Sequence, residues 1–519
     1  MAVSTVVDLL AERAEAHPDA AAVESGEEVI GYAELHHRAV ACAHTLKASG
    51  VHKGDRVALL QRNSVEALAW FFGVLQTGAV AVVVHESLKA HQVGHILRHS
   101  GAQVLVTGAR QRRQLVREFE GVRMVDAAEV PAGQPPTGPS PWPPLLGSDL
   151  AALIYTSGST GLPKGIMVTH TNLVAGARIV ARYLRLTPAD RTLAVLPWCF
   201  DAGLNQVLAT FWAAGTLVIA GSVYAPDICR TLVTHRVTGM AGVPPLWELM
   251  VGRPSPFLTL DLPELRYLTN TGGVLRPGTL ERIRQAHPRT DVYLMYGLTE
   301  AFRSTYLPPA ALDERPGSIG RAVPETEVLV LDEAGRPCAP GEVGELVHRG
   351  PTVAAGYWHD AEATARTFRP YPFASEGAWP EFVVFSGDYV RSDDDGYLYY
   401  VGRRDEQFKS RGFRISPTEV ESAISASGLV TQVVVCGENN DEGDTDVVAA
   451  VVPTDPGAFT TEALAAYCRT TMPGHHLPAR FVVLRDFPLT SSGKVDRARV
   501  KGQALAAGPG TQGADRRAG

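Results

Sequence analysis

Cysteine is scarce in this chain, and no two cysteines form a C-x-x-C pair. The 519 residues contain six of them: Cys42, Cys199, Cys229, Cys338, Cys436 and Cys468. This wide spacing argues against a disulfide scaffold and against a clustered zinc site, and it fits a reducing compartment. We therefore expect a cytoplasmic location.

Long apolar runs and an excess of positive charge are also missing. No run of about 18 apolar residues occurs, so we expect no membrane span. The opening stretch MAVSTVVDLLAERAEAHPDA turns polar early, which predicts an amphipathic helix rather than a signal peptide. The formal net charge is -7 with mixed signs. The sequence therefore lacks the basic face of a nucleic-acid-binding protein.

Helical and strand patterns alternate along most of the chain, whose length predicts at least two domains. SVEALAWFFGVLQTG predicts a buried helix that ends at Gly78, and AVAVVV predicts a strand directly after it. The short β-rich runs QVLVTG, DLAALIYTSG, RTLAVLPW, GTLVIAG and VTGMAGVP are mostly separated by helical patterns. The predicted fold class is α/β, with largely parallel sheets covered by helices.

Beyond about residue 320 the alternation of helix and strand patterns gives way to short strand patterns separated by turn residues. TEVLVLDEAG, GEVGELVHRG and DGYLYYVGR read as hairpin strands of a small antiparallel β subdomain. From Glu406 a strand, helix, strand pattern predicts a compact α+β domain at the C-terminus. The last stretch, AAGPGTQGADRRAG, has little to bury, and we expect it to be disordered.

One loop, YTSGSTGLPKG from Tyr155 to Gly165, is rich in small hydrogen-bonding residues and contains one lysine. Glycines let the backbone approach a ligand, hydroxyls donate hydrogen bonds, and the lysine adds a point charge. This combination suits a triphosphate, although the order differs from a Walker loop. The alternative is a flexible Ser/Gly turn.

The loop resembles the phosphate loop of the adenylate-forming superfamily, which includes acyl-CoA synthetases, peptide-synthetase adenylation domains and luciferases. Further motifs occur in that family's order. GYAEL and GDRVALL precede the loop, and FDAG, NTGGVL, YGLTE, GELVHRGPTVAAGY, SGDYV, GRRDEQFKSRGFRI and SSGKVDR come after it. The resemblance extends over about residues 5 to 502, and so many motifs in order leave chance a negligible share.

The resemblance implies an AMP-forming ligase that uses ATP and Mg²⁺. A carboxylic acid attacks the α-phosphate, pyrophosphate leaves, and a thiol takes the acyl group from the acyl-adenylate. The implied domains are an AMP-binding domain at 1–404, a mobile C-terminal lid at 405–502 and a tail at 503–519. Asp405 matches the family's hinge residue, although a plain linker aspartate is the alternative.

Nucleotide-binding roles transfer by position. The implied phosphate cradle consists of Thr156, Ser157, Gly158, Ser159, Thr160, Gly161 and Lys164. The implied adenine slot consists of Gly272, Gly273 and Tyr296. Thr299 matches the α-phosphate hydroxyl and Glu300 the Mg²⁺ ligand, whereas the pair taken alone is more typical of a helix cap.

Three more polar residues receive roles from the resemblance. Asp388 matches the ribose-binding carboxylate, and Arg403 is implied as a further nucleotide-binding residue. Lys494 matches the catalytic lysine that bridges the substrate carboxylate and the α-phosphate. Their structural alternatives are a turn aspartate, a solvated surface arginine and a solvated loop lysine.

The acid pocket implied by the resemblance is formed by Asp201, Asn205, Thr271, Met295 and Arg303. An aspartate opposite an arginine favours a small acid that carries an amine and a second carboxylate, as in β-amino-acid adenylation enzymes. Asp201 would bind the amine, and Arg303 with Thr271 the distal carboxylate. The alternatives are a structural carboxylate at Asp201 and a structural ion pair at Arg303.

The expected thiol acceptor is phosphopantetheine. The sequence ends soon after SSGKVDR, so we expect a free carrier protein as the partner, with coenzyme A (CoA) as the alternative acceptor.

Overall fold

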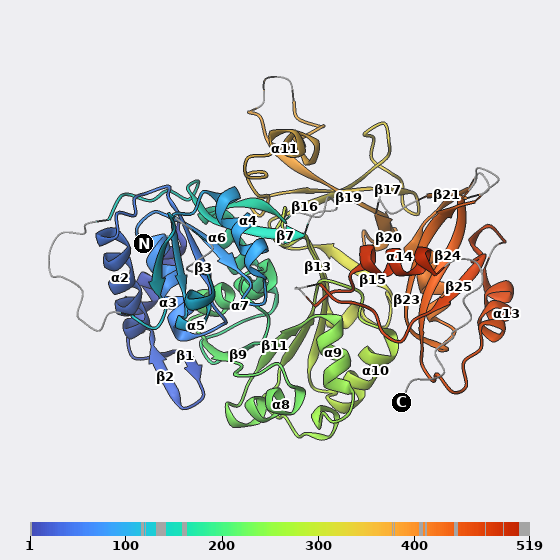
Figure 1. The fold of residues 1–519 in the computed structure, drawn as a ribbon, viewed down its shortest axis with the longest axis horizontal. Coiled ribbons are helices and arrows are strands. Elements are labelled where there is room, and N and C mark those ends of the chain that lie inside the picture. Colours follow the sequence, from blue (N-terminus) through green and yellow to red (C-terminus); the bar gives the residue numbers. More distant parts are fainter. Residues whose placement is uncertain are drawn as a thin grey trace. The chain divides into compact units, whose positions relative to one another are not determined.

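The computed structural model describes residues 3–115, 119, 121–130, 142–157, 163–375, 377, 379–403, 408–410, 413–440, 445–472, 474–490 and 493–507 (Figure 1). The chain divides into two compact units. The first combines Met1–Val328 with Val347–Ser386, and the second combines Leu329–Leu346 with Gly387–Gly519. The boundary predicted between residues 404 and 405 stays a prediction, because both residues lie outside the described ranges.

A six-stranded sheet in the first unit holds the candidate phosphate loop. Its order is β6-β5-β3-β4-β7-β8, with every neighbouring pair parallel except β7 and β8. The strands are β3 (Arg56–Leu60), β4 (Val80–Val84), β5 (Val104–Thr107), β6 (Arg123–Asp126), β7 (Leu150–Ser157) and β8 (Pro163–Thr169). The helices of this region are α2 (Tyr32–Ala48), α3 (Val65–Gln76), α4 (Ala90–Ser100) and α5 (Ala109–Leu115).

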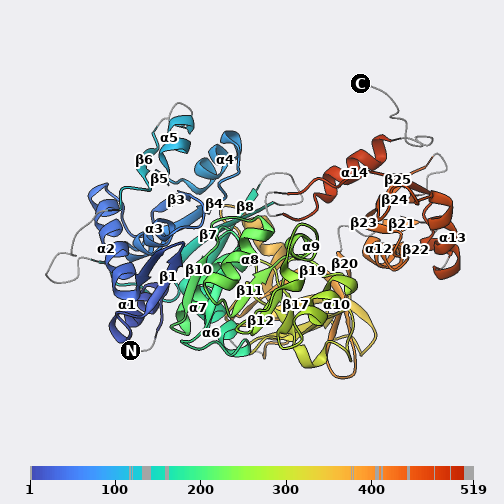
Figure 2. The same ribbon diagram turned by 90° about the horizontal axis from the view of Figure 1, so that it is seen from below.

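A second sheet of the first unit is parallel at its centre (Figure 2). Strands β1, β10, β9, β11, β12 and β13 follow one another in parallel, and β2, β14 and β15 are antiparallel to their neighbours. These strands are β1 (Ala21–Ser25), β2 (Glu28–Gly31), β9 (Arg191–Ala194), β10 (Thr216–Ile219), β11 (Gly239–Gly242), β12 (Tyr267–Asn270), β13 (Asp291–Tyr296), β14 (Thr305–Leu307) and β15 (Ser318–Ala322). The largely parallel α/β class predicted from the sequence is confirmed.

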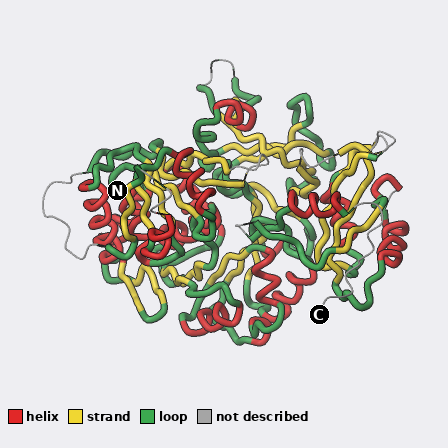
Figure 3. The backbone as a smooth tube through the Cα atoms, in the orientation of Figure 1, coloured by secondary structure: helices red, strands yellow, loops and turns green. Residues whose placement is uncertain are grey.

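Helices alternate with these strands along the chain. Figure 3 distinguishes helices, in red, from strands, in yellow. They are α1 (Val6–Ala16), α6 (His170–Tyr183), α7 (Asp201–Trp212), α8 (Ala225–Thr234), α9 (Pro244–Val251), η1 (Phe257–Thr259), α10 (Pro277–Ala286) and η2 (Pro309–Ala311). The first of them matches the amphipathic helix predicted for the opening stretch, because its buried residues, Val6, Leu9 and Leu10, recur at helical spacing.

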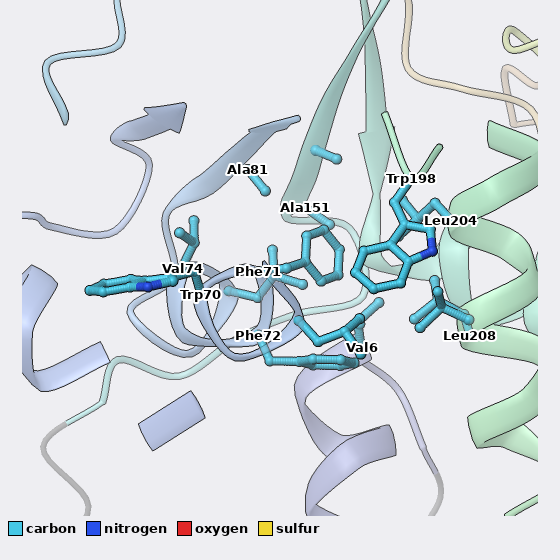
Figure 4. Packing of buried hydrophobic residues seen from close by; sticks show 14 of the residues in the cluster. Val6, Trp70, Phe71, Phe72, Val74, Ala81, Ala151, Trp198, Leu204 and Leu208 are labelled. Carbon is cyan, nitrogen blue, oxygen red and sulfur yellow. The ribbon is translucent and has the colours of Figure 1, made fainter. Parts of the chain in front are cut away.

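Helix α3 shows how local sequence determines an element that the core then buries. Ser64 caps its N-terminus by accepting a hydrogen bond from Ala67 N (3.1 Å), and Gly78 follows its C-terminus with a φ of 78°. Both predictions for this stretch, a buried helix ending at Gly78 and a strand after it, are confirmed. Aromatic side chains of α3 pack with apolar residues of α7 and of the segment before it (Figure 4): Trp70, Phe71, Phe72, Trp198, Leu204 and Leu208.

Strands of the predicted antiparallel subdomain follow β15 in the chain. They are β16 (Glu327–Leu331), β17 (Val343–Arg349), β18 (Phe368–Pro370), β19 (Phe382–Ser392) and β20 (Leu398–Arg403), with α11 (Ala361–Thr367) before β18. Strand β19 pairs antiparallel with both β18 and β20, as the hairpin-like texture of the sequence predicts.

The C-terminal part of the second unit is an α+β arrangement. It contains the sheet β23-β24-β25 and the hairpin β21–β22. The bounds are β21 (Phe408–Ser410), β22 (Phe413–Ile415), α12 (Pro417–Ser425), β23 (Val430–Asn439), β24 (Thr445–Pro453), α13 (Thr461–Thr471), η3 (Gly474–His476), β25 (Arg480–Val483) and α14 (Arg497–Ala506).

The predicted tail at 503–519 begins too early. Helix α14 continues to Ala506, because Val500 and Ala504 are fully buried in one apolar cluster with residues of β23 and β24. Residues 508–519 lie outside the described ranges. Within the described part of the chain, every helix is too short or too polar to cross a bilayer.

Candidate active site

The phosphate-loop motif lies on the hairpin formed by β7 and β8. Thr156 pairs with Lys164 and Ser157 with Pro163 at its open end. Gly158, Ser159, Thr160 and Gly161 lie outside the described residues, as does the side chain of Ser157. The Lys164 ammonium bonds to Asp360 Oδ2 (3.0 Å) and lies 5.5 Å from the centre of the Tyr357 ring. A backbone hydrogen bond from Ala363, followed by this bond to Lys164, lowers the pKa of the Asp360 carboxyl.

Tyr357 connects this lysine to the predicted metal ligand. Its hydroxyl donates to Glu300 Oε1 (2.7 Å), and the Ala354 amide donates to the Glu300 carbonyl (2.9 Å). Thr299 and Glu300 are half-buried in the turn that follows β13. A second segment therefore holds Glu300 in place.

The Glu300 carboxylate has the chemistry expected of a ligand for Mg²⁺ that binds together with a nucleotide. Among the described residues, no group of three or more His, Cys, Asp or Glu side chains is arranged to hold a metal. Mg²⁺ needs no such cage, because it is commonly held by one or two carboxylates together with substrate phosphates and waters. The Glu300 carboxylate is a hard oxygen donor of this chemical kind.

Two neighbouring parallel strands place the predicted adenine slot and the Thr299–Glu300 turn at one edge of the sheet. Thr271, Gly272 and Gly273 follow β12, and Tyr296 ends β13. Carboxyl ends of parallel strands meet at the same edge, where open α/β sheets bind ligands. Gly272 has a φ of 74°, which favours glycine.

Side chains next to this slot support it. The Asn270 side-chain amide donates to the Gly273 carbonyl (2.9 Å) and so fixes the glycine turn. The ring of His348, on β17, stacks on Tyr296 with centroids 6.2 Å apart and an angle of 22° between the planes. Burial lowers the pKa of His348 to about 3, and neither ring nitrogen has a hydrogen-bond partner in the structure.

The predicted acid pocket corresponds to a cavity of about 30 Å³ in the first unit. Its lining includes Asn205 of α7, Thr271 after β12, Met295 of β13 and Arg303. Apolar side chains such as Val180 and Leu184 complete the wall. Four of the five residues predicted for the pocket are thus brought together.

Asp201, the fifth predicted residue, reaches this cavity through Arg303. It is the first residue of α7, and its Oδ2 lies 3.9 Å from Arg303 Nη1. That distance is too long for a hydrogen bond. Arg303 is only 5% exposed, its Nη1 makes a long hydrogen bond to Thr271 Oγ1 (3.5 Å), and its buried Nε has no partner in the structure. The guanidinium is therefore incompletely paired.

The remaining predicted residues belong to the second unit. Asp388 is buried on β19, where Arg403 Nε lies 3.3 Å from its Oδ1 and Tyr400 OH donates to the same oxygen (3.4 Å). Lys494 is exposed in a tight turn, in which Thr490 N donates to the Lys494 carbonyl (2.7 Å). Asp405 lies outside the described residues.

Sequence reasoning missed several residues of this site. Tyr357 closes the quoted motif GELVHRGPTVAAGY, and its position in that motif was the available signal. Asn270 and His348 lie in the quoted motifs NTGGVL and GELVHRGPTVAAGY, so their signal was likewise the motif itself. Asp360 lies outside the quoted motifs and carried no recognisable signal, since its contact with Lys164 joins segments far apart in the chain.

Comparisons with known proteins agree with these features. Residues 10–358 match the family model described as AMP-binding enzyme, and residues 419–494 match the one described as AMP-binding enzyme C-terminal domain. A feruloyl-CoA synthase of Amycolatopsis is 33% identical over 94% of this chain and 97% of its own length.

Longer relatives match over only part of their length. The tyrocidine synthase 3 of Brevibacillus parabrevis is 30% identical over 95% of this chain and 8% of that protein. The phosphinothricin tripeptide synthetase PhsC of Streptomyces viridochromogenes is 34% identical over 95% of this chain and 44% of that protein. The chain thus spans less than half of either synthetase.

A solved structure has the same fold. The o-succinylbenzoate CoA synthetase of Bacillus subtilis, in complex with its acyl-adenylate intermediate, has a TM-score of 0.84 and 26% sequence identity. The match covers 95% of this chain and 97% of that one.

Proposed function

Because the chain belongs to the AMP-binding enzyme family, we propose that it is an AMP-forming ligase for a small carboxylic acid. The acid is activated with ATP as an acyl-adenylate, and the acyl group then passes to a phosphopantetheine thiol. The order of the family motifs and the full-length match to a CoA synthase support the adenylation step.

The first step is a displacement at phosphorus. A carboxylate oxygen of the acid forms a bond to the α-phosphorus, the bond to the bridging oxygen of the β-phosphate breaks, and pyrophosphate leaves. In the second step the thiolate attacks the acyl carbon and AMP leaves. Such phosphoryl transfer depends on placement and charge neutralisation rather than on a protein nucleophile.

The residues of this chain supply that placement and charge. Thr156 and Lys164 would hold the β- and γ-phosphates together with Ser157, Gly158, Ser159, Thr160 and Gly161. Thr299 would donate to the α-phosphate, Tyr296 would stack on adenine beside Gly272 and Gly273, and Asp388 and Arg403 would bind the ribose. Lys494 would carry positive charge to the reacting oxygens, and Asp405 would act as the hinge of the lid.

Glu300 would hold Mg²⁺ through its carboxylate, which accepts a hydrogen bond from the Tyr357 hydroxyl at Oε1. When bound, the ion neutralises charge that develops on the phosphate oxygens. The Tyr357 hydroxyl keeps the carboxylate oriented.

The acid itself would carry an amine and a second carboxylate. The observation that supports this is the buried, incompletely paired guanidinium of Arg303 beside Asp201. A buried charge is costly unless it is fully paired. A substrate carboxylate would complete the pairing of Arg303 with help from Thr271, and a substrate ammonium would bind Asp201.

The thiol acceptor has two candidate sources. The family's peptide synthetases favour a free carrier protein. The feruloyl-CoA synthase, which matches over nearly its whole length, favours CoA instead. Both carry the same phosphopantetheine thiol. The six cysteines are free in the structure, which supports the proposed cytoplasmic location.

Mass spectrometry of the products tests this proposal. The protein is incubated with ATP, Mg²⁺, an acid panel and either CoA or a phosphopantetheinylated carrier. We expect AMP, pyrophosphate and one acyl thioester. Lys494→Ala should lose product, whereas Lys501→Ala, which removes another exposed lysine, should not. The absence of AMP with every acid would contradict the proposal.

A further inference from the structure

We propose that His95 and His99 of helix α4 are positioning residues that hold both strands of the β7–β8 hairpin. This hairpin carries the phosphate-loop motif and is called the phosphate hairpin below. The inference rests on the proposed function, because it assigns the ends of that hairpin to ATP binding. Neither histidine lies in one of the family motifs of this sequence quoted above. Figures 1 and 2 show α4 beside the hairpin strands.

Each histidine bonds to a different strand. His95 Nε2 lies 3.1 Å from the carbonyl oxygen of Pro163, the first residue of β8. A carbonyl only accepts hydrogen bonds, so His95 Nε2 must carry the proton. His99 Nδ1 lies 2.8 Å from the hydroxyl of Tyr155 on β7. The histidines are one helical turn apart, and their rings stack with centroids 5.5 Å apart.

The helix that carries both histidines is itself anchored. Arg56 donates to the carbonyls of Ser100 (2.8 Å) and Gly101 (3.1 Å) at its C-terminal end. The indole of Trp358 donates to the His99 carbonyl (3.2 Å). These carbonyls would otherwise lack partners at a helix end, so the bonds fix the helix as well as the imidazoles.

The side chain of Tyr155 connects His99 to the second strand of the hairpin, because its ring packs against Gly165 of β8. Tyr155 pairs with Gly165 in the β7–β8 register, and a Cβ at residue 165 would lie only 3.1 Å from the Tyr155 ring. The last glycine of the loop motif therefore makes room for this ring. His99 fixes the hydroxyl end of the same side chain.

The outer edge of β8 is held by the chain around Tyr357, which forms an antiparallel bridge with Ile166. The Trp358 amide donates to the Gly165 carbonyl (2.8 Å), and the Met167 amide donates to the Gly356 carbonyl (2.9 Å). Lys164 bonds to Asp360 on this side. With both sides bonded, the strands that flank the phosphate loop are ordered before ATP binds, which lowers the entropic cost of binding.

A neutral imidazole at His99 suits this arrangement. Burial lowers the pKa of His99, the neighbouring His95 and His359 lower it further, and Asp360 acts in the opposite sense. Burial also raises the pKa of the Tyr155 phenol, so its hydroxyl keeps the proton that it can donate to His99.

Isothermal titration with ATP and with AMP tests the inference on the intact protein. His95→Phe keeps an aromatic ring but removes the donor to Pro163, and we expect the dissociation constant for ATP to rise about fivefold. AMP has no β- or γ-phosphate, so its dissociation constant should stay the same. His95→Gln places an amide donor near the position of Nε2 and should restore ATP binding. His91→Phe, the same change at an exposed position of α4, is the matched control.

The outcomes separate this inference from the proposed function. Equal weakening of ATP and AMP binding in His95→Phe, or no weakening in either His95→Phe or His99→Phe, would overturn the positioning role. Failure of the unmodified protein to bind ATP would instead overturn the proposed function.

Discussion

The phosphate hairpin and the acid cavity differ in how completely their polar side chains are paired within the protein. At the hairpin, Lys164 is bonded to Asp360, and Tyr155 is bonded to His99. At the cavity, Arg303 Nε, Asn205 Nδ2 and Gln206 Oε1 are buried without a hydrogen-bond partner among the described residues. A buried polar group without a partner costs about 1–3 kcal/mol. The cavity therefore has more to gain from a ligand than the hairpin does.

This difference assigns different tasks to the two regions. The hairpin is ordered by the protein alone, which suits a nucleotide that never varies. The cavity leaves polar atoms for the substrate to complete, and an acid that lacks the matching groups leaves them unpaired. We expect substrate choice to depend mainly on the cavity.

The largest expected effect is at Arg303. In Arg303→Met, kcat/KM for an acid with a second carboxylate should fall about 10³-fold, because a buried charge-assisted contact of about 4 kcal/mol is lost. The KM for ATP should not change. Pyrophosphate exchange measures both, and Arg289→Met, at an exposed arginine, is the control. An equal loss with acids that lack a second carboxylate would place Arg303 in a structural role.

His170, a buried histidine that accepts a hydrogen bond, should make the free energy of unfolding depend on pH. His170 Nδ1, directly after β8, accepts from the Val6 amide (3.2 Å), and burial lowers the pKa of His170 to about 4. Its unfolded pKa is about 6.5, so between these values the unfolded state binds more protons. Its contribution to the free energy of unfolding is present above pH 6.5 and should fall by about 3 kcal/mol as the pH drops to 4.

Urea unfolding between pH 7 and pH 4 measures this dependence. His170→Asn keeps an acceptor near the Nδ1 position and should flatten the profile, whereas His52→Asn, at a side chain that is 83% exposed, should not. If the free energy of unfolding of His170→Asn still fell with pH as steeply as that of the unmodified protein, other groups would control the loss of stability in acid.

The packing of the hairpin predicts a smaller effect at Gly165. Gly165→Val pushes a side chain against the Tyr155 ring and should lower the free energy of unfolding by about 2 kcal/mol. A Cβ at Gly278, in α10, would have no neighbouring atom within 4 Å, so Gly278→Val should have nearly no effect. Chemical denaturation compares the two. Equal stability of both variants would remove the claim that Gly165 accommodates the ring.

The smallest expected effect is at His348, whose ring nitrogens have no hydrogen-bond partners among the described residues. His348→Phe keeps the ring stacked on Tyr296 but removes two buried nitrogens without hydrogen bonds. We expect the free energy of unfolding to rise by about 1 kcal/mol, because an uncompensated desolvation cost disappears. Thermal unfolding measures it. A decrease of the same size would mean that the nitrogens make hydrogen bonds in solution.

Local patterns predicted much of the fold. The cap at Ser64, the apolar face of the next helix and Gly78 lie close together in sequence, so α3 could be predicted with its ends. The alternation of helix and strand patterns likewise predicted the parallel sheets, and the order of motifs predicted the family.

Contacts between distant segments could not be predicted in this way. His99 and Tyr155 are separated by 56 residues, and Lys164 and Asp360 by 196. No local pattern encodes such contacts. The 3.9 Å separation of Asp201 and Arg303 also depends on how α7 packs beside the sheet. The roles of the predicted site residues therefore remain predictions that the variants above can test.

Acid-dependent exchange of labelled pyrophosphate into ATP tests the central claim most directly. The panel should contain aspartate, 3-methylaspartate, β-alanine and fatty acids. We predict exchange that depends on the acid and is fastest with compounds carrying both an amine and a second carboxylate. No exchange with any acid would contradict adenylation itself, and exchange with fatty acids alone would contradict the account of the cavity.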